Sequence, residues 1–188
     1  YSVALQSLLT NGHTVYGMVM PEGTEIASAS SHTGTPLYQF IGPVIVTLNT
    51  ALATYATVHM VGLSGGGWTT VLAAAADTRI TKSYQFVGSM PLYMYPSRDW
   101  EQYLPGLTAN YLELYIMAAS GIGRRHKQIL HESDVYDFSR PAFNKGWDYS
   151  STVASKAAAL SGYYDLVWKD ALHEFSQPSF DDEVIAEI

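Results

Sequence analysis

Two kinds of hydrophobic pattern follow one another along the chain. Continuous apolar runs that contain β-branched residues predict five strands, at 13–21, 57–63, within 80–90, at 126–134 and at 163–171. Apolar residues at helical spacing predict helices at 1–10, 36–55, 67–76, 109–119, 151–161 and 180–188. The small and polar residues at 22–35 predict a loop.

Strands and helices therefore alternate through most of the chain. This order predicts an α/β fold, a mostly parallel sheet with helices on both faces in a three-layer sandwich, because parallel strands need a crossover that is usually helical. Residues 91–123, which are rich in aromatic side chains, predict an insertion. We expect 1–188 to form a single domain, and because the chain opens without Met inside a predicted helix, we expect further residues upstream of Tyr1.

Composition and charge exclude several classes of function. The net charge is −7, and the only basic cluster is Arg124-Arg125-His126-Lys127, so we expect no nucleic-acid partner. The chain has no cysteine, which excludes disulfides, thiol catalysis and cysteine-ligated metals. No uninterrupted apolar run reaches about 18 residues, so no membrane span is expected. Oligomeric state and cellular location are not indicated.

The stretch VHMVGLSGGGWTT, at 58–70, carries the clearest chemical signal. It places a G-x-S-x-G motif, centred on Ser64, between a predicted strand and a predicted helix. A serine at such a sharp turn projects its hydroxyl beyond the edge of the sheet, and the glycines on either side remove side chains that would clash there. The following helix offers free N–H groups to a developing oxyanion. We therefore predict Ser64 as a nucleophile.

Two other glycine-rich motifs fit this stretch less well. A phosphate-binding loop would need a Lys-Ser or Lys-Thr pair, and Trp68 stands where the charge would be required. A dinucleotide-binding loop would need G-x-G-x-x-G, which GLSGGG does not supply.

A serine nucleophile needs a histidine base and an acid that orients it. Enzymes with this strand-turn-helix arrangement place them in the chain order serine, acid, histidine. His173 follows the last predicted strand and is the predicted base, and Asp134, at the end of an earlier strand, is the predicted acid. Glu132 and Asp137 remain alternatives for the acid, since neither strand alternation nor spacing excludes them.

At this point the chain resembles the α/β-hydrolase superfamily. GLSGGGWTT resembles its nucleophile elbow, ILHESDVYDF its acid strand and loop, and KDALHEFS its histidine loop. Other stretches, such as GSMPLY and NYLELY, resemble a bacterial branch that includes acetyl xylan esterases and dienelactone-hydrolase-like enzymes. The resemblance implies Ser64, Asp134 and His173 as catalytic residues and the N–H of Gly65 as one oxyanion donor. The second donor normally comes from a loop after an earlier strand, which often carries a His-Gly pair, and this chain has no His-Gly pair.

The implied activity is hydrolysis of a small-molecule carboxylic ester through an acyl-enzyme, with no metal or organic cofactor. The aromatic insertion could shape a substrate pocket or pack against the body of the domain, and no substrate-binding residue is assigned. Two alternatives share the same frame. One is a peptidase or an acyltransferase, and the other is a binding protein without catalytic activity.

Overall fold

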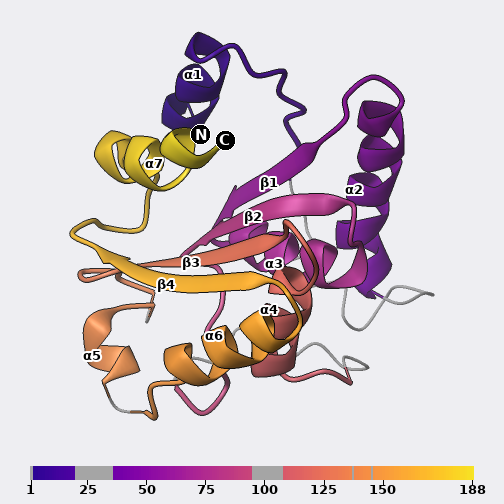
Figure 1. Ribbon diagram of the computed structural model, residues 1–188. Helices are drawn as coiled ribbons and strands as arrows, with labels where there is room; N and C mark the ends of the chain where they lie inside the picture. Colours follow the sequence, from indigo (N-terminus) through magenta and orange to yellow (C-terminus); the bar gives the residue numbers. More distant parts are fainter. Residues whose placement is uncertain (1, 20–35, 95–107, 137, 145) are drawn as a thin grey trace.

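The computed structural model describes the chain in five ranges, 2–19, 36–94, 108–136, 138–144 and 146–188. Four strands form its sheet: β1 (Val58–Leu63), β2 (Ile80–Phe86), β3 (Arg125–His131) and β4 (Tyr163–Lys169). They lie in the order β1-β2-β3-β4, and each neighbouring pair is parallel. In the described residues the sheet is thus wholly parallel, so the four carboxyl ends meet at one edge (Figure 1).

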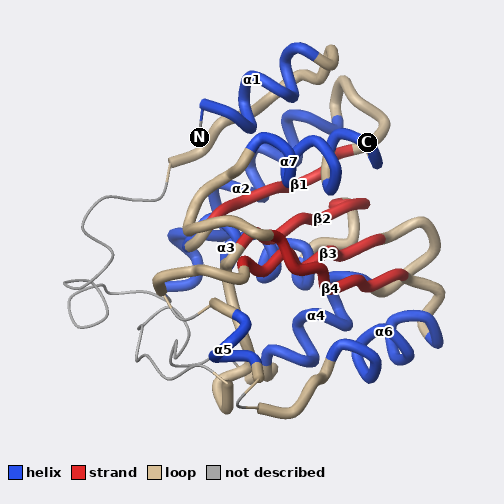
Figure 2. The backbone as a smooth tube through the Cα atoms, turned by 90° about the vertical axis from the view of Figure 1, so that its left-hand side faces the viewer, coloured by secondary structure: helices blue, strands red, loops and turns tan. Residues whose placement is uncertain are grey.

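Helices cover both faces of this sheet, as predicted for a three-layer α/β fold (Figure 2). On one face lie α3 (Gly65–Ala76), α4 (Tyr111–Ala119) and α6 (Ser150–Ala159), while α2 (Pro36–Leu52) packs beside α3 and β1. On the other face α1 (Ser2–Thr10) contacts α7 (Gln177–Glu183), which continues into the 3₁₀ turn η2 (Ile185–Glu187). A short helix, α5 (Arg140–Phe143), was not predicted from the sequence.

One predicted strand is absent. Residues 13–19 form no strand, and the end of the predicted range, 20–21, lies outside the described residues. Thr14 accepts a hydrogen bond from the hydroxyl of Tyr55 at 2.9 Å, which ties this segment to the region before β1. Of the described strands, β1 therefore has a neighbour only on its β2 side. The apolar run is genuine, but a strand also needs a partner ladder, which no local pattern guarantees.

The apolar face of α2 follows from its sequence. In α2 the buried residues Phe40, Val44, Leu48 and Ala51 recur at helical spacing, and the helix runs on through Pro43. The ring of Phe40 meets that of Trp68 edge to face, with centroids 5.2 Å apart. Such a stripe explains why α2 packs against α3.

Part of the aromatic insertion belongs to the core. Tyr111 and Tyr115, both in α4, are buried, and the hydroxyl of Tyr111 accepts a 3.0 Å hydrogen bond from the indole of Trp68. Three further rings of the insertion, those of Tyr95, Trp100 and Tyr103, lie outside the described residues. Packing onto the body of the protein is therefore the correct interpretation for Tyr111 and Tyr115, whereas Tyr93, the third described tyrosine of the insertion, is 53 % exposed.

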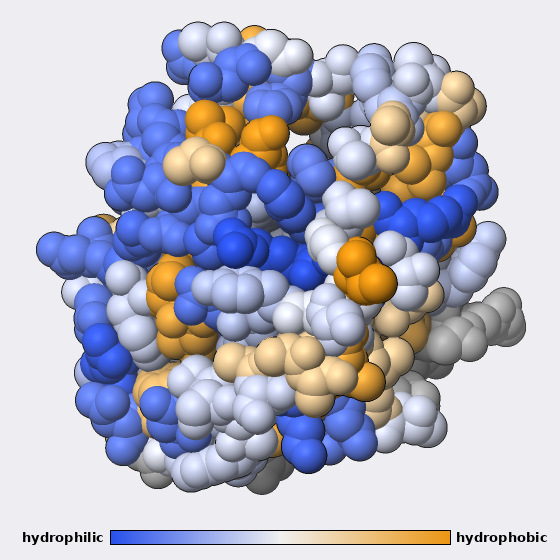
Figure 3. Space-filling view, viewed as in Figure 1, coloured by the Kyte–Doolittle hydropathy of each residue, from blue (hydrophilic) through white to orange (hydrophobic). Residues whose placement is uncertain are grey.

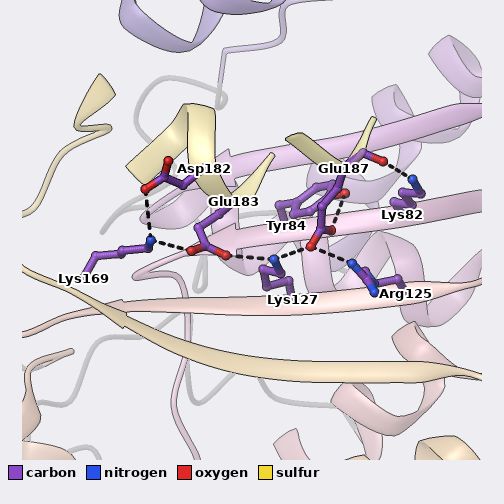
Figure 4. A network of polar contacts seen from close by, with 8 residues as sticks. All are labelled: Lys82, Tyr84, Arg125, Lys127, Lys169, Asp182, Glu183 and Glu187. Atoms are coloured by element: carbon purple, nitrogen blue, oxygen red, sulfur yellow. Dashed lines mark hydrogen bonds and ion pairs between the residues drawn. The ribbon is translucent and has the colours of Figure 1, made fainter. Parts of the chain in front are cut away.

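Charged side chains join the C-terminal segment to the sheet. We call this set the α7 network: Lys82, Tyr84, Arg125, Lys127, Lys169, Asp182, Glu183 and Glu187 (Figure 4). Lys127 on β3 lies between the carboxylates of Glu183 and Glu187 and is 5 % exposed at its side chain. Arg125 contacts Glu187 at 2.6 Å, and Lys169 contacts Glu183 at 2.5 Å. Hydrophilic residues also gather between α7 and the strands in the space-filling view (Figure 3).

The basic partners change how the two glutamates titrate. Burial alone would raise the pKa of Glu183 and of Glu187, but hydrogen bonds from basic residues outweigh burial and leave each pKa below its ordinary value of 4.5. For Glu187 those residues are Lys127 and Arg125, and for Glu183 they are Lys127 and Lys169. A carboxylate with a lowered folded pKa stabilises the fold above the unfolded pKa, and this contribution is lost as the pH falls through the folded pKa.

We therefore expect the free energy of unfolding to fall between about pH 6 and about pH 3, partly through this network. Glu187→Gln leaves Lys127 and Arg125 with one charged partner fewer and should cost about 1–3 kcal/mol at neutral pH. Urea unfolding of the wild type and this variant across that pH range is the measurement. An equal pH dependence in both proteins would contradict the assignment.

Candidate active site

Ser64 stands at the turn between β1 and α3. Its φ of 57° and ψ of −126° put it in a left-handed conformation that serine rarely adopts, and it occupies the N-cap position of α3. Two backbone hydrogen bonds hold the turn: the N–H of Ser64 donates to the carbonyl of Phe86, and the N–H of Trp68 donates to the carbonyl of Ser64, both at 2.9 Å. The residue is thus fixed in a strained conformation just beyond the carboxyl end of β1.

Close backbone contacts explain the glycines around this turn, though not all of them as predicted. A Cβ on Gly62 would lie 2.1 Å from the carbonyl oxygen of Gly66. A Cβ on Gly66, by contrast, would meet nothing within 4 Å, so the clash expected there is absent. Gly67 is the second position that must lack a side chain, since its Cβ would lie 2.9 Å from the carbonyl oxygen of Phe86. The start of α3 therefore packs directly on the ends of β1 and β2.

Asp134 and His173 come together at the same edge of the sheet. Asp134 lies three residues beyond β3 and His173 four residues beyond β4, and the Nδ1 atom of His173 is 2.6 Å from the Oδ2 atom of Asp134. The other carboxylate oxygen, Oδ1, accepts the N–H groups of Tyr136 at 2.7 Å and Phe138 at 3.2 Å. The carboxylate of Asp134 is fully buried, whereas the imidazole of His173 is 15 % exposed. The acid is therefore held rigidly, and the histidine reaches the surface.

The two alternative acids stand apart from this pair. Glu132 forms an ion pair with Arg140, with a 3.0 Å contact, and both side chains are more than a third exposed. Asp137 lies outside the described residues. Sequence alternation placed Glu132 and Asp134 on the same side of β3, but the strand ends at His131, so that alternation does not extend to either residue.

Three of the other histidines lie in strands of the sheet, where His126 and His131 are buried and His59 is partly buried. Burial lowers the pKa of His59 to about 4 and that of His126 to about 3, and it also lowers the pKa of His131. His59 contacts the hydroxyl of Thr81 and His126 that of Ser83. A proton-transferring base must meet the substrate, so the buried rings of His126 and His131 are unsuited to that role. His32 lies outside the described residues.

Two features of the histidine loop were not predicted from the sequence. The ring of His173 lies between aromatic neighbours: Tyr136 meets it nearly at right angles, 4.5 Å between centroids, and Phe138 stacks on it at 6.4 Å. His131, the last residue of β3, also contacts the backbone carbonyl of Leu172 through Nδ1. In the sequence, the only feature that could have indicated Tyr136 and Phe138 is that they closely follow Asp134. No feature of the sequence indicated the contact of His131.

The described residues show no gathering of three or more His, Asp or Glu side chains that could hold a metal ion. Among the helices in the described ranges, none has both the length and the apolar character needed to cross a bilayer.

Comparison with solved structures places this architecture among known folds. The chain resembles the esterase Pf2001 of Pyrococcus furiosus (TM-score 0.62, 12 % identity) over 99 % of its own length and 72 % of that protein. It also resembles an esterase domain from Rhodothermus marinus (TM-score 0.59, 13 % identity) over 99 % of its length and 76 % of that domain. An acetyl xylan esterase from Paenibacillus sp. R4 matches 92 % of the chain with a TM-score of 0.52 and 15 % identity.

The chain has the α/β-hydrolase fold. It spans about half (53 %) of a Klebsiella pneumoniae protein assigned as a dienelactone hydrolase, and 58 % of the Paenibacillus esterase. No family model matches the sequence, and no curated protein matches it. Because every identity quoted is below 25 %, these similarities establish the α/β-hydrolase fold alone.

The glycine contacts of the α/β-hydrolase turn lead to a matched test. Gly62→Ala would drive its new methyl group into the backbone of Gly66 and should destabilise the fold by about 3 kcal/mol or more, or prevent folding. Gly66→Ala adds the same atom in open space within a helix and should change stability by less than about 1 kcal/mol. Chemical denaturation of both variants measures the difference. Equal stabilities would show that the turn is not packed in this way.

Proposed function

We propose that this protein is a serine hydrolase that cleaves a carboxylic ester with Ser64 as nucleophile, His173 as base and Asp134 as the acid that orients it. The observation that carries the proposal is the 2.6 Å contact between Asp134 and the Nδ1 atom of His173. It lies at the sheet edge beyond which β1 delivers Ser64 in its left-handed turn. Because Asp134 occupies Nδ1, only the opposite nitrogen of His173, Nε2, is available to Ser64 or to a substrate.

In the first step the hydroxyl oxygen of Ser64 attacks the ester carbonyl carbon and its proton passes to Nε2 of His173. The carbonyl oxygen becomes an oxyanion. Gly65 is the first residue of α3, where N–H groups have no partner within the helix, and its N–H donates to this oxyanion. His173 then gives its proton to the departing alcohol, and the acyl group stays on Ser64.

In the second step His173 removes a proton from a water molecule, which attacks the acyl carbon. The bond to Ser64 breaks, the serine recovers its proton from His173, and the carboxylic acid leaves. Asp134 stays ionised throughout and stabilises the imidazolium that forms in both steps.

The comparisons support this proposal at the level of class. Two of the solved structures similar to this chain over 99 % of its length are an esterase and an esterase domain. A puromycin-hydrolysing peptidase from Mycobacterium tuberculosis is also similar, with a TM-score of 0.55 and 17 % identity, over 24 % of its own length. Ester cleavage is therefore the first activity to test, and amide cleavage is the alternative on the same frame.

A fluorophosphonate probe tests the nucleophile directly, because it labels only an activated serine. We expect labelling of the wild type and none of Ser64→Ala or His173→Ala, while Asp134→Asn should slow labelling by about 10³-fold. Ser161→Gly is the matched control, since Ser161 also has a left-handed φ, 61°, but lies exposed before the start of β4. Intact-protein mass spectrometry measures the adduct.

His13→Ala serves as the histidine control, because His13 lies near His59 on β1 and precedes Ser64 in the chain. Absence of labelling in the folded wild type would refute the serine hydrolase and favour a binding protein. Labelling that survives in Ser64→Ala would assign the nucleophile to another residue.

Apolar side chains beside His173 bear on the alcohol part of the ester. His173 hands its proton to the alcohol, so that group must lie against Nε2 while it leaves. Tyr136 is 60 % exposed and in ring contact with His173, and Leu172, which precedes His173, is 55 % exposed. These surfaces favour a ring or a branched alkyl group over a methyl group.

Tyr136→Ala should therefore lower kcat/KM for a benzyl ester by about tenfold and change that for the ethyl ester of the same acid by less than about twofold. Tyr136→Phe should keep the wild-type ratio of kcat/KM for the benzyl ester to kcat/KM for the ethyl ester. Steady-state hydrolysis of matched ester pairs provides the measurement. A uniform loss on both esters would mean that Tyr136 acts on His173 and not on the substrate.

A further inference from the structure

A second histidine lies beside the proposed base and takes no part in the proton transfers. His131 ends β3, is fully buried, and has its Nδ1 atom in hydrogen-bond contact with the carbonyl oxygen of Leu172. Its Nε2 atom is also buried and has no hydrogen-bond partner. A buried polar atom without a partner carries a free-energy cost, which an apolar side chain at this position would avoid.

The contact determines which nitrogen of His131 carries the proton. A carbonyl oxygen can only accept, so Nδ1 is the protonated nitrogen and Nε2 holds a lone pair. Burial lowers the pKa of His131, although the contact with Leu172 works in the opposite direction. A second proton would place an N–H group at Nε2 without an acceptor. His131 is therefore neutral and acts as a donor to one backbone oxygen.

That oxygen belongs to the peptide that leads directly into His173. The carbonyl of Leu172 also accepts the N–H of Glu174 at 2.9 Å, so both of its lone pairs are engaged. The side chain of Leu172 is exposed and gives the loop little packing at this point. The tip of the loop is thus held through its backbone and not through a hydrophobic anchor.

The end of β3 consequently holds the histidine loop in two places. His131 holds the peptide before His173, and Asp134, three residues further along, holds the imidazole itself. On the far side of the loop, Phe175 meets Phe86 edge to face, with centroids 5.0 Å apart. The ring of His131 lies against the same Phe86 at 6.2 Å. These contacts hold the imidazole of His173 and the backbone on both sides of it.

We propose that His131 is a positioning residue: its Nδ1–H, donated to the carbonyl of Leu172, sets the backbone from which His173 meets Asp134 and the serine. The inference rests on the proposed function and deepens it by assigning a residue that acts through His173. Catalytic geometry tolerates little displacement, and a shift of about 1 Å can cost about 100-fold in rate. A group that fixes the backbone of the base thereby affects kcat more than substrate binding.

Two substitutions separate the donor from the bulk of the ring. His131→Leu keeps an apolar side chain of similar reach but removes the donor. His131→Asn keeps an N–H donor at the same distance from the backbone, because Nδ2 of asparagine and Nδ1 of histidine are both bonded to Cγ. We expect His131→Leu to lower kcat by about 10- to 100-fold with KM within about twofold, and His131→Asn to recover most of that loss.

A second readout does not depend on turnover. In the wild type the Nδ1–H of His173, hydrogen-bonded to Asp134, should give a downfield imidazole N–H proton signal that disappears in His173→Ala. We expect this signal to persist in His131→Asn and to broaden or vanish in His131→Leu while the fold, followed by circular dichroism, is unchanged. If His131→Leu does not fold, His131→Met makes the same comparison with a more adaptable side chain.

The outcomes of the two proposals are distinguishable. An unlabelled wild type would end the serine hydrolase proposal, and the proton signal would still test the contact of His131. Full kcat and an intact signal in His131→Leu would overturn the positioning role. Equal losses in His131→Leu and His131→Asn would overturn it as well, because they would show that the ring is needed for packing and not for its donor.

Discussion

The rest of the site depends on the close approach of α3 to the ends of β1 and β2. Gly62 lies against the backbone of Gly66, and Gly67 lies against the carbonyl of Phe86. The first turn of α3 therefore leaves no room for a side chain at Gly62 or Gly67. At this turn Ser64 has a positive φ of 57°. The position of the serine thus follows from backbone packing, and the residue stands directly before the first turn of α3.

The other part of the site, the pair of Asp134 and His173, depends on contacts between the loops that follow β3 and β4. Asp134 is held by two backbone N–H groups of its own turn, and it holds the ring of His173 in place. The chain after His173 leads into α7, where the ring of Phe180 stacks on that of Phe86. Glu183 of the same helix forms ion pairs with two lysines of the sheet, Lys127 and Lys169. The C-terminal helix therefore packs against the residues that follow His173 as well as against one face of the sheet.

Sequence patterns predicted the elements that local chemistry decides. All six predicted helices begin within three residues of the prediction, although the sixth is divided into the helix Gln177–Glu183 and a 3₁₀ turn. Four strands of five appear, and the fifth, at 13–21, fails because an apolar run cannot state whether a partner strand lies beside it. The choice between Glu132 and Asp134 was equally beyond local patterns, since it depends on where β3 ends and on the position of Arg140.

The sequence by itself determined the alternation that makes a parallel sheet, the strand-turn-helix setting of Ser64, and the chain order in which an acid and a histidine should follow. These are local properties, written in periodicity and in glycine spacing. The tertiary structure alone decided which acid meets His173, that a side chain is excluded at Gly67 and not at Gly66, and that His131 contacts the carbonyl of Leu172. Each of these joins residues distant in sequence or turns on tenths of an ångström, and contacts of that kind arise only when the sheet brings its strand ends together.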